Sequence, residues 1–275
     1  MSSNLTLERC VVRGTNRGKG RRLALSPATS AARQLHYGRV SLDPKAPPLH
    51  FETGERETGF VSLGGRAEVR TGGRAFTLAP YDALYVPRDA DVEVEPGAAG
   101  CDLAEIAAPV DRAYPLQFVS WADVQQDPGL HFKAGVPPTE RTLNILIGKN
   151  VEAGRILCGV TFSTPGNWTS WPPHEHAAML EEAYLYVAMP QPAFGVQLVY
   201  TDPAAPELAV IVREGDVVLM PRGYHPNVSA PGGSINFLLM MAAHREGVDR
   251  QFGVVNVQPE FAAGGSGLDP GRAAR

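Results

Sequence analysis

Long hydrophobic runs are missing from this chain of 275 residues. No stretch of 18 consecutive apolar residues occurs, so we expect no membrane-spanning helix and no membrane partner. The first residues lack the charged and then apolar pattern of a secretory signal, and only three cysteines are present, widely spaced. An odd, sparse set of cysteines is typical of free thiols in a reducing compartment, which favours the cytoplasm.

An excess of positive charge is also missing. The formal net charge is -4 and the isoelectric point is near 6.0, which argues against a nucleic-acid partner. Helix signals are few, and the best of them is the segment 120–126, where Ser120 can cap a short helix. Hydrophobic residues nevertheless make up 44% of the chain, enough for a substantial core.

Glycine and proline are abundant, with 29 and 24 residues, well above the usual share. They separate short apolar or alternating stretches rich in β-branched and aromatic residues, which is typical of strands joined by turns. The pairs at 64–65 and 72–73 bracket one hairpin, and the Gly/Ala/Ser-rich stretch from about 262 to 275 is expected to be a flexible tail. We therefore predict an all-β fold with little helix, whose strands include 59–63, 67–70, 83–86, 183–187, 196–200, 208–212 and 235–240.

The chain contains an internal repeat. Residues 47–52 can be laid over 172–177 without a gap, which places Glu57 on Glu182, and residues 84–88 match 218–222 further on. Two similar halves of short strands indicate a duplicated β-barrel or sandwich. We predict an N-terminal domain at 1–125 and a C-terminal domain at 126–275.

Three histidines and a glutamate of the second half form a candidate metal site. His174 and His176 would point to the same side of an extended strand, and a turn delivers His225 at the start of a later strand. Three imidazoles and one carboxylate suit Zn, Fe, Mn or Ni and leave positions open for a substrate. We expect one divalent ion per chain, with zinc as the first choice.

The carboxylate ligand is either Glu181 or Glu182. Glu182 is favoured because it has the same parity as Tyr184 and Tyr186, and because its repeat counterpart is also a glutamate. In the first half, the counterparts of the three histidines cannot rebuild the site, so the first barrel is expected to be degenerate and metal-free. Those counterparts are Leu49, Phe51 and Asp91.

This arrangement resembles the two sequence motifs of the cupin superfamily, of which the first supplies two His and a Glu and the second a His. The surrounding sequence resembles the family of bacterial 5-deoxy-glucuronate isomerases of myo-inositol catabolism, over roughly residues 9 to 260. The spacing of five residues between His176 and Glu182 is shorter than in those enzymes and is closer to a related uronate isomerase of pectin breakdown. The blocks that carry the resemblance are 164–176, 194–202 and 215–226, together with 51–57 and 84–87.

The resemblance implies a bicupin, two tandem jelly-roll barrels (the double-stranded β-helix fold) with the metal in the second. It also implies a cytoplasmic enzyme, expected to be a homo-oligomer, that isomerises the small sugar acid 5-deoxy-glucuronate, an aldose, to the ketose 2-deoxy-5-keto-gluconate. Such a reaction moves a proton or a hydride between adjacent carbons. Three other possibilities remain open: an isomerase of another deoxy- or keto-uronate, a cupin dioxygenase, and a non-catalytic sugar-binding bicupin.

Several side chains could serve as acid, base or hydrogen-bonding groups near the metal. Gln197 lies among apolar residues of a strand, where an unpaired amide would be costly. A uronate also carries a carboxylate, which an arginine fork binds well, and Arg222, Arg141 and Arg213 are candidates for that contact. The predicted catalytic residues are Tyr184, Gln197, Tyr200 and Arg222.

Overall fold

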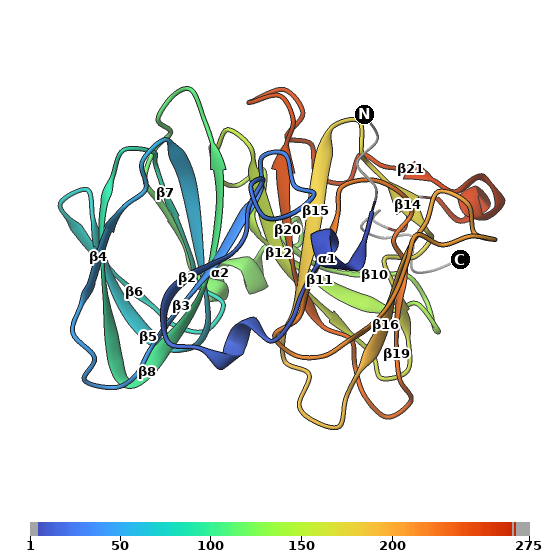
Figure 1. Cartoon of the computed structure of the whole chain (residues 1–275), viewed down its shortest axis with the longest axis horizontal. Coiled ribbons are helices and arrows are strands. Elements are labelled where there is room, and N and C mark those ends of the chain that lie inside the picture. The colour runs from blue at the N-terminus through green and yellow to red at the C-terminus, as the bar shows by residue number, and fades with distance from the viewer. Residues whose placement is uncertain (1–4, 266, 268–275) are drawn as a thin grey trace.

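The computed structural model describes residues 5–265 and 267 and consists of two β-barrels side by side (Figure 1). The first barrel is one sheet in the order β2-β3-β8-β5-β7-β9, with β4 paired to β8 and β6 paired to β5. Its strands are β2 (Gly20–Leu25), β3 (His36–Leu42), β4 (Leu49–Glu52), β5 (Arg56–Thr71), β6 (Arg74–Leu78), β7 (Ala83–Val86), β8 (Asp91–Pro109) and β9 (Gln117–Val119).

The second barrel combines a seven-stranded sheet, in the order β1-β18-β15-β20-β12-β11-β10, with a four-stranded sheet, β13-β19-β16-β17, and the pair β14-β21. Its strands are β1 (Val11–Val12), β10 (His131–Ala134), β11 (Arg141–Ile147), β12 (Ile156–Ser163), β13 (Trp168–Thr169), β14 (His174–Glu175), β15 (Leu180–Tyr186), β16 (Gly195–Val199), β17 (Leu208–Val212), β18 (Val217–Met220), β19 (Asn227–Ser229), β20 (Phe237–Ala243) and β21 (Asn256–Val257).

Helices are short in the described part of the chain: α1 (Leu7–Cys10), η1 (Thr15–Arg17), α2 (Trp121–Gln126) and η2 (Pro259–Gly264). The predicted helix at 120–126 is confirmed, because the Ser120 hydroxyl accepts the Asp123 N–H at 3.0 Å and caps α2. The expected tail begins later than predicted, since 262–264 belong to η2. The rest of that prediction, at 266 and 268–275, lies outside the described residues.

The predicted hairpin is present, with the turn at 72–73 between β5 and β6. The glycines at 64–65 lie inside β5, where the pairing with β8 shifts register. Each shift is a bulge that lets one long strand bend around the barrel.

The central strands of the first barrel are buried on both faces. On β7, Leu84 and Val86 point into the first barrel, whereas Ala83 and Tyr85 belong to the large apolar cluster that continues into the second. The barrels approach closely here, since a Cβ on Gly59 would lie 2.7 Å from Cδ1 of Ile147. Burial on both faces explains why these strands are apolar without clean alternation.

The two barrels do not divide the chain at one point. Strand β1, near the N-terminus, pairs with β18 and so extends the sheet of the second barrel (Figure 1). The predicted N-terminal domain at 1–125 therefore contributes its first strand to the other barrel, and α1 lies against the same strand β18.

The carboxylate of Glu57, on β5, joins the first barrel to the second. It is fully buried and accepts the backbone N–H groups of residues 154–156 at 2.6–2.8 Å. The Tyr85 hydroxyl also donates to it, at 2.6 Å. Those three N–H groups lie where the chain enters β12, so the contact fixes the edge of the second barrel against the first.

The carboxylate of Glu181, on β15, makes the same contact in the opposite direction. It is fully buried and accepts the backbone N–H groups of residues 33–35 at 2.5–2.6 Å, where the chain enters β3 of the first barrel. Buried carboxylates need such donors, because an unpaired one would be strongly destabilising. The two barrels are thus held together by a reciprocal pair of carboxylate contacts.

The overlay of the two halves predicted from sequence is one residue out of register at Glu57. Strand pairing places Thr58 opposite Val86, and Glu182 opposite Met220. Val86 and Met220 are repeat partners, so the counterpart of Glu182 is Thr58, not Glu57 as predicted. Glu57 instead corresponds to the neighbouring glutamate that contacts residues 33–35. The overlay predicted from sequence is therefore shifted by one residue at Glu57.

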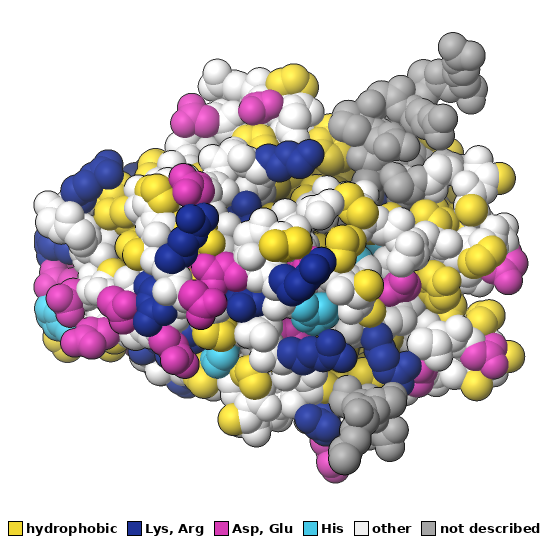
Figure 2. Space-filling model, turned by 90° about the horizontal axis from the view of Figure 1, so that it is seen from above, with side chains coloured by type: hydrophobic (Ala, Val, Ile, Leu, Met, Phe, Trp, Pro, Cys, Tyr) yellow, Lys and Arg dark blue, Asp and Glu magenta, His cyan; other side chains and the backbone are white. Residues whose placement is uncertain are grey.

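The surface of the described residues mixes charges of both signs. Figure 2 shows Lys and Arg side chains interspersed with Asp and Glu over the visible face, without one sign gathering in a large patch. Arg70, for example, lies among the carboxylates of Glu68, Glu93 and Glu95. None of the helices in the described ranges has the length and apolar character needed to cross a membrane.

Candidate metal centre

The four predicted metal ligands come from three parts of the second barrel. His174 lies on β14, and His176 follows just after that strand. Glu182 lies on β15, and His225 lies in the turn between β18 and β19. All four side chains are buried, with at most 6% of any of them exposed. The strand pattern thus brings together residues separated by up to about fifty positions.

Three of the four ligands form a tight group. Nε2 of His176 lies 3.0 Å from Oε2 of Glu182, and Nε2 of His225 lies 3.1 Å from the same oxygen. The ligand atoms of these three residues all lie within 4.8 Å of one another. His174 lies beside them, with its ring centroid 4.9 Å from that of His225. A single ion could contact the first three, whereas His174 lies next to this group but outside it.

The orientation of each imidazole is fixed from behind by the backbone. Nδ1 of His174 lies 2.8 Å from the carbonyl of residue 172, Nδ1 of His176 lies 3.2 Å from that of residue 180, and Nδ1 of His225 lies 2.9 Å from that of residue 223. A carbonyl can only accept, so each Nδ1 carries the proton. In a neutral ring the Nε2 lone pair is then free for a metal, which is the usual second-shell arrangement.

Among the described residues, two buried atoms of the group make no hydrogen bond, Oε1 of Glu182 and Nε2 of His225. A buried acceptor left without a donor costs about 1–3 kcal/mol. A divalent cation would satisfy both atoms at once. The residues present therefore fit a metal ion of the kind that the donor set indicates, with nitrogen and oxygen ligands.

The electrostatics of the group match this interpretation. Burial alone would raise the pKa of Glu182, but the adjacent imidazoles of His176 and His225 lower it to about 2. Burial, together with the neighbouring His225, lowers the pKa of His174 to about 3, so the His174 ring is neutral at neutral pH. A charged carboxylate and a neutral imidazole are the protonation states that bind metals.

A narrow cavity of about 40 Å³ opens onto three of the candidate ligands, His174, His176 and Glu182. Ligand sites usually measure on the order of several hundred Å³, so a sugar acid can enter only if part of the wall moves. The segment 251–255 covers one side and precedes β21, which pairs with the His174 strand. The other lining residues are Arg141, Leu143, Thr161, Ser170, His174, His176, Leu180, Glu182, Tyr184, Phe237, Leu239 and Met241.

Of the four predicted catalytic residues, Tyr184 lines this cavity. Its ring stacks on Phe237, with 4.0 Å between the ring centroids, and its hydroxyl lies 2.8 Å from the hydroxyl of Ser170. Burial raises the pKa of Tyr184 well above its usual value, and the nearby Glu182 charge raises it further. Tyr184 therefore keeps its proton and can donate a hydrogen bond into the cavity.

The other three lie outside the cavity lining. Gln197 is buried, and its amide donates to the backbone carbonyl of His225 at 2.8 Å while it accepts the hydroxyl of Tyr186 at 2.7 Å. The Tyr200 hydroxyl donates to Gln258 at 2.8 Å, and Arg222 pairs with Glu207 at 3.0 Å. Gln197 thus holds the loop of a metal ligand, and its polar groups are satisfied internally.

Sequence reasoning missed several cavity residues. Ser170 belongs to the Trp-rich block before His174, so its proximity to the histidines in sequence could have indicated it. Thr161 and the segment 251–255 carry no such signal, because they reach the cavity through long-range strand pairing.

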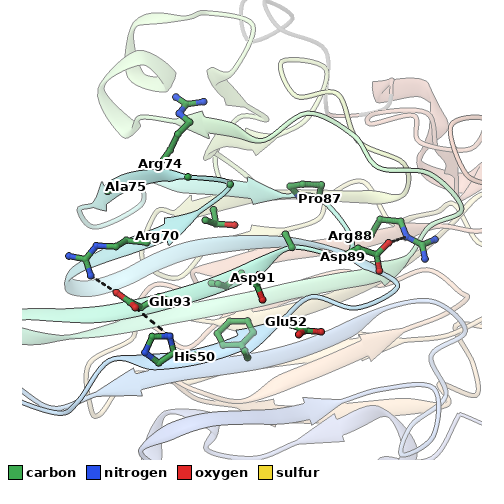
Figure 3. Close-up of a pocket in the computed structure, with 16 residues that line it drawn as sticks. His50, Glu52, Arg70, Arg74, Ala75, Pro87, Arg88, Asp89, Asp91 and Glu93 are labelled. Atoms are coloured by element: carbon green, nitrogen blue, oxygen red, sulfur yellow. Dashed lines mark hydrogen bonds and ion pairs between the residues drawn. The ribbon is translucent and has the colours of Figure 1, made fainter.

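The first barrel has a larger hollow of about 940 Å³, lined by β4, the turn between β5 and β6, and the segment 87–93 (Figure 3). Several of its charged side chains pair with one another: His50 lies 3.3 Å from Glu93, and Arg88 lies 2.7 Å from Asp89. Two expected counterparts of the metal ligands lie here, Phe51 and Asp91. Phe51 packs edge-on against Phe60 and cannot ligate a metal. That the first barrel binds no metal remains a prediction.

Two β-barrels in tandem, with buried histidines and a carboxylate in one of them, define a bicupin. Two solved structures support the fold. An IolB-like protein from Salmonella typhimurium LT2 matches with a TM-score of 0.81, at 22% identity over 92% of this chain and 98% of that one. An oxalate decarboxylase mutant from Bacillus subtilis matches with a TM-score of 0.60, at 11% identity over 88% of this chain and 78% of that one.

Residues 11–258 match the model of the KduI/IolB family. The chain belongs to this family. It is 33% identical over 216 residues to a protein named 5-deoxy-glucuronate isomerase from Geobacillus thermodenitrificans, covering 72% of this chain and 76% of that protein. A protein of the same name from Bacillus subtilis strain 168 is 27% identical over 196 residues, covering 69% and 68%.

Proposed function

We propose that this protein is a metal-dependent aldose–ketose isomerase that converts 5-deoxy-glucuronate to 2-deoxy-5-keto-gluconate. The observation that carries the proposal is the buried group of His176, Glu182 and His225 at a cavity in a member of the KduI/IolB family. Its relatives named 5-deoxy-glucuronate isomerase support the choice of substrate.

His174, His176, Glu182 and His225 would hold one divalent ion, with zinc proposed first and manganese, iron or nickel as alternatives. When bound, the ion would supply a Lewis acid for the carbonyl and the adjacent hydroxyl of the sugar. The chain contributes fixed ligands, since each Nδ1 is held by a backbone carbonyl.

Tyr184 is proposed as the hydrogen-bond donor and general acid at a sugar oxygen. Its hydroxyl, next to that of Ser170, remains protonated and faces the cavity. It can donate a hydrogen bond to a sugar oxygen as charge develops there during isomerisation. Gln197 is proposed to act on His225 by holding its backbone carbonyl, and Tyr200 and Arg222 to support the surrounding loops.

The direct test is to incubate the purified protein, loaded separately with Zn, Mn, Fe or Ni, with 5-deoxy-glucuronate and to follow the ketose by NMR. We expect ketose formation, lost in Glu182→Gln. A protein that retains bound metal but forms no ketose would overturn the substrate assignment. The short spacing between His176 and Glu182 makes the deoxy-keto-uronate of pectin breakdown the second sugar to test.

We make two further proposals, that the protein is located in the cytoplasm and that it self-associates. The first is supported by the cysteines, which are unpaired and buried. The second is supported by large apolar side chains exposed on α1 and β2, with Leu7 at 56% and Leu23 at 63% exposure. Cell fractionation and sedimentation velocity would test them, and a monomer at micromolar concentration would refute self-association.

A further inference from the structure

The cavity beside His174, His176 and Glu182 contains a buried arginine that has no carboxylate partner among the described residues. Arg141 is the first residue of β11, is only 3% exposed, and lines the same cavity as His174, His176 and Glu182. An arginine is always charged at neutral pH, and a buried charge without a counter-ion is strongly unfavourable. Its presence at this position therefore needs a reason.

The contacts of Arg141 are with backbone carbonyls. Nη1 donates to the carbonyl of Thr139 at 3.2 Å, and Nη2 donates to that of Gly267 at 3.0 Å. Within the described ranges no carboxylate lies within ion-pair distance of its guanidinium. Arg39 provides a contrast, because it is equally buried but forms a two-pronged ion pair with Asp102.

The buried position of Arg141 affects the pKa of its guanidinium. Burial lowers the pKa of Arg141 to about 10, and the neighbouring Tyr184 opposes this only in part. The side chain still carries its charge at neutral pH, without the compensation that Asp102 gives to Arg39. An incoming anion would supply that compensation.

The other arginines considered for a carboxylate do not share this position. Arg222 is already paired with Glu207 at 3.0 Å, and Arg213 is exposed on the surface. Neither lines the cavity. The sequence left three arginines as candidates for binding a carboxylate. Burial, ion pairing and position at the cavity together favour Arg141.

We propose that Arg141 binds the carboxylate of the sugar acid and so makes the site selective for acids over neutral sugars. This inference rests on the proposed function, because it assumes that the metal-site cavity receives the sugar. A guanidinium and a carboxylate form two parallel hydrogen bonds, which fixes the direction of the ligand as well as its charge. With the carboxylate at Arg141, the carbonyl end of the sugar extends toward the histidines. A neutral sugar would leave the guanidinium unpaired.

The test compares a sugar acid with its neutral analogue in the wild-type protein and in three variants. Wild type, Arg141→Gln, Arg141→Lys and the matched control Arg222→Gln are each assayed with 5-deoxy-glucuronate and with 5-deoxy-glucose, which has an alcohol in place of the carboxylate. Charge-assisted hydrogen bonds predict that Arg141→Gln loses about 10- to 100-fold in kcat/KM for the acid, mostly through KM. We expect the neutral sugar to be unaffected, Arg141→Lys to recover part of the loss, and Arg222→Gln to keep the acid preference.

A binding measurement separates this inference from the proposed function. Calorimetric titration of the metal-loaded proteins with glucuronate and with glucose reports the carboxylate contact without turnover. If wild type forms no ketose but binds glucuronate in preference to glucose, and Arg141→Gln loses that preference, the inference stands and the proposed function fails. An equal acid preference in wild type and Arg141→Gln would overturn the inference. Should Arg141→Gln not fold, an unchanged preference in Arg141→Lys would overturn it too.

Discussion

Replacing Glu181 by glutamine tests the contact that locks the two barrels together beside the metal site. The carboxylate accepts three backbone N–H groups of residues 33–35 at 2.5–2.6 Å in a fully buried position. Glutamine has one acceptor oxygen, and its NH₂ group would face N–H donors. With about 1.5–3 kcal/mol for each hydrogen bond to a charged group, a net loss of roughly 2–4 kcal/mol in the free energy of unfolding is expected.

The chain offers a matched control in Glu57, which accepts three backbone N–H groups of residues 154–156 in the same geometry. Glu57→Gln should cost at least a similar amount, because the three backbone contacts match and Glu57 accepts the Tyr85 hydroxyl in addition. It lies far along the chain from the ligands, whereas Glu181 is adjacent to Glu182 on β15. We therefore expect Glu181→Gln, and not Glu57→Gln, to weaken zinc binding, by about tenfold as for outer-shell changes in metal sites.

Urea unfolding followed by circular dichroism measures the stability of each variant, and competition with a chromophoric chelator measures zinc affinity. An unchanged unfolding midpoint in Glu181→Gln would refute the energetic argument. If both variants weakened zinc binding equally, the effect would be general destabilisation, and the connection from Glu181 to the metal ligand would be refuted.

Three further predictions concern the site. Glu182→Gln should abolish stoichiometric zinc retention after gel filtration, measured by elemental analysis, because it removes the one anionic ligand of the group; a variant with one zinc per chain would exclude Glu182 as a ligand. Tyr184→Phe should lower kcat by about 100-fold or more with metal content unchanged, since a phenol that donates to the sugar is lost; a wild-type kcat would remove Tyr184 from the mechanism. In the metal-free protein, the pKa of His174 is about 3 when folded and about 6.5 when unfolded, so the unfolded chain binds the extra proton first and stability falls as pH decreases from 6.5 toward 3. Through this group, the free energy of unfolding changes by at most about 1.4 kcal/mol per pH unit. The urea midpoint should therefore fall between pH 7 and pH 5 in wild type, and fall less in His174→Gln. An equal fall in both proteins would contradict the assignment of this pKa to His174.

The local pattern of the sequence was sufficient for the strands and for the helix at 120–126, and it named four candidate ligands that the structure brings near one another. Strand alternation depends on neighbours, and Ser120 caps its own helix, so both can be recognised without knowing the fold. Parity places His174 with His176 on one side of an extended segment, and Glu182 with Tyr184 on one face of β15, wherever those strands lie. The family resemblance also follows from residues that are close together in sequence.

Tertiary structure decided what depends on contacts between the barrels. Glu57 and Glu181 face backbone N–H groups of the opposite barrel, more than ninety residues away along the chain, so a gap-free overlay within each half could not set their register. The sequence could not choose among its arginines either, because only packing shows that Arg141 is buried at the cavity while Arg222 is paired with Glu207. Periodicity tells which side chains share a face of a strand, and the packing of distant strands determines what that face meets.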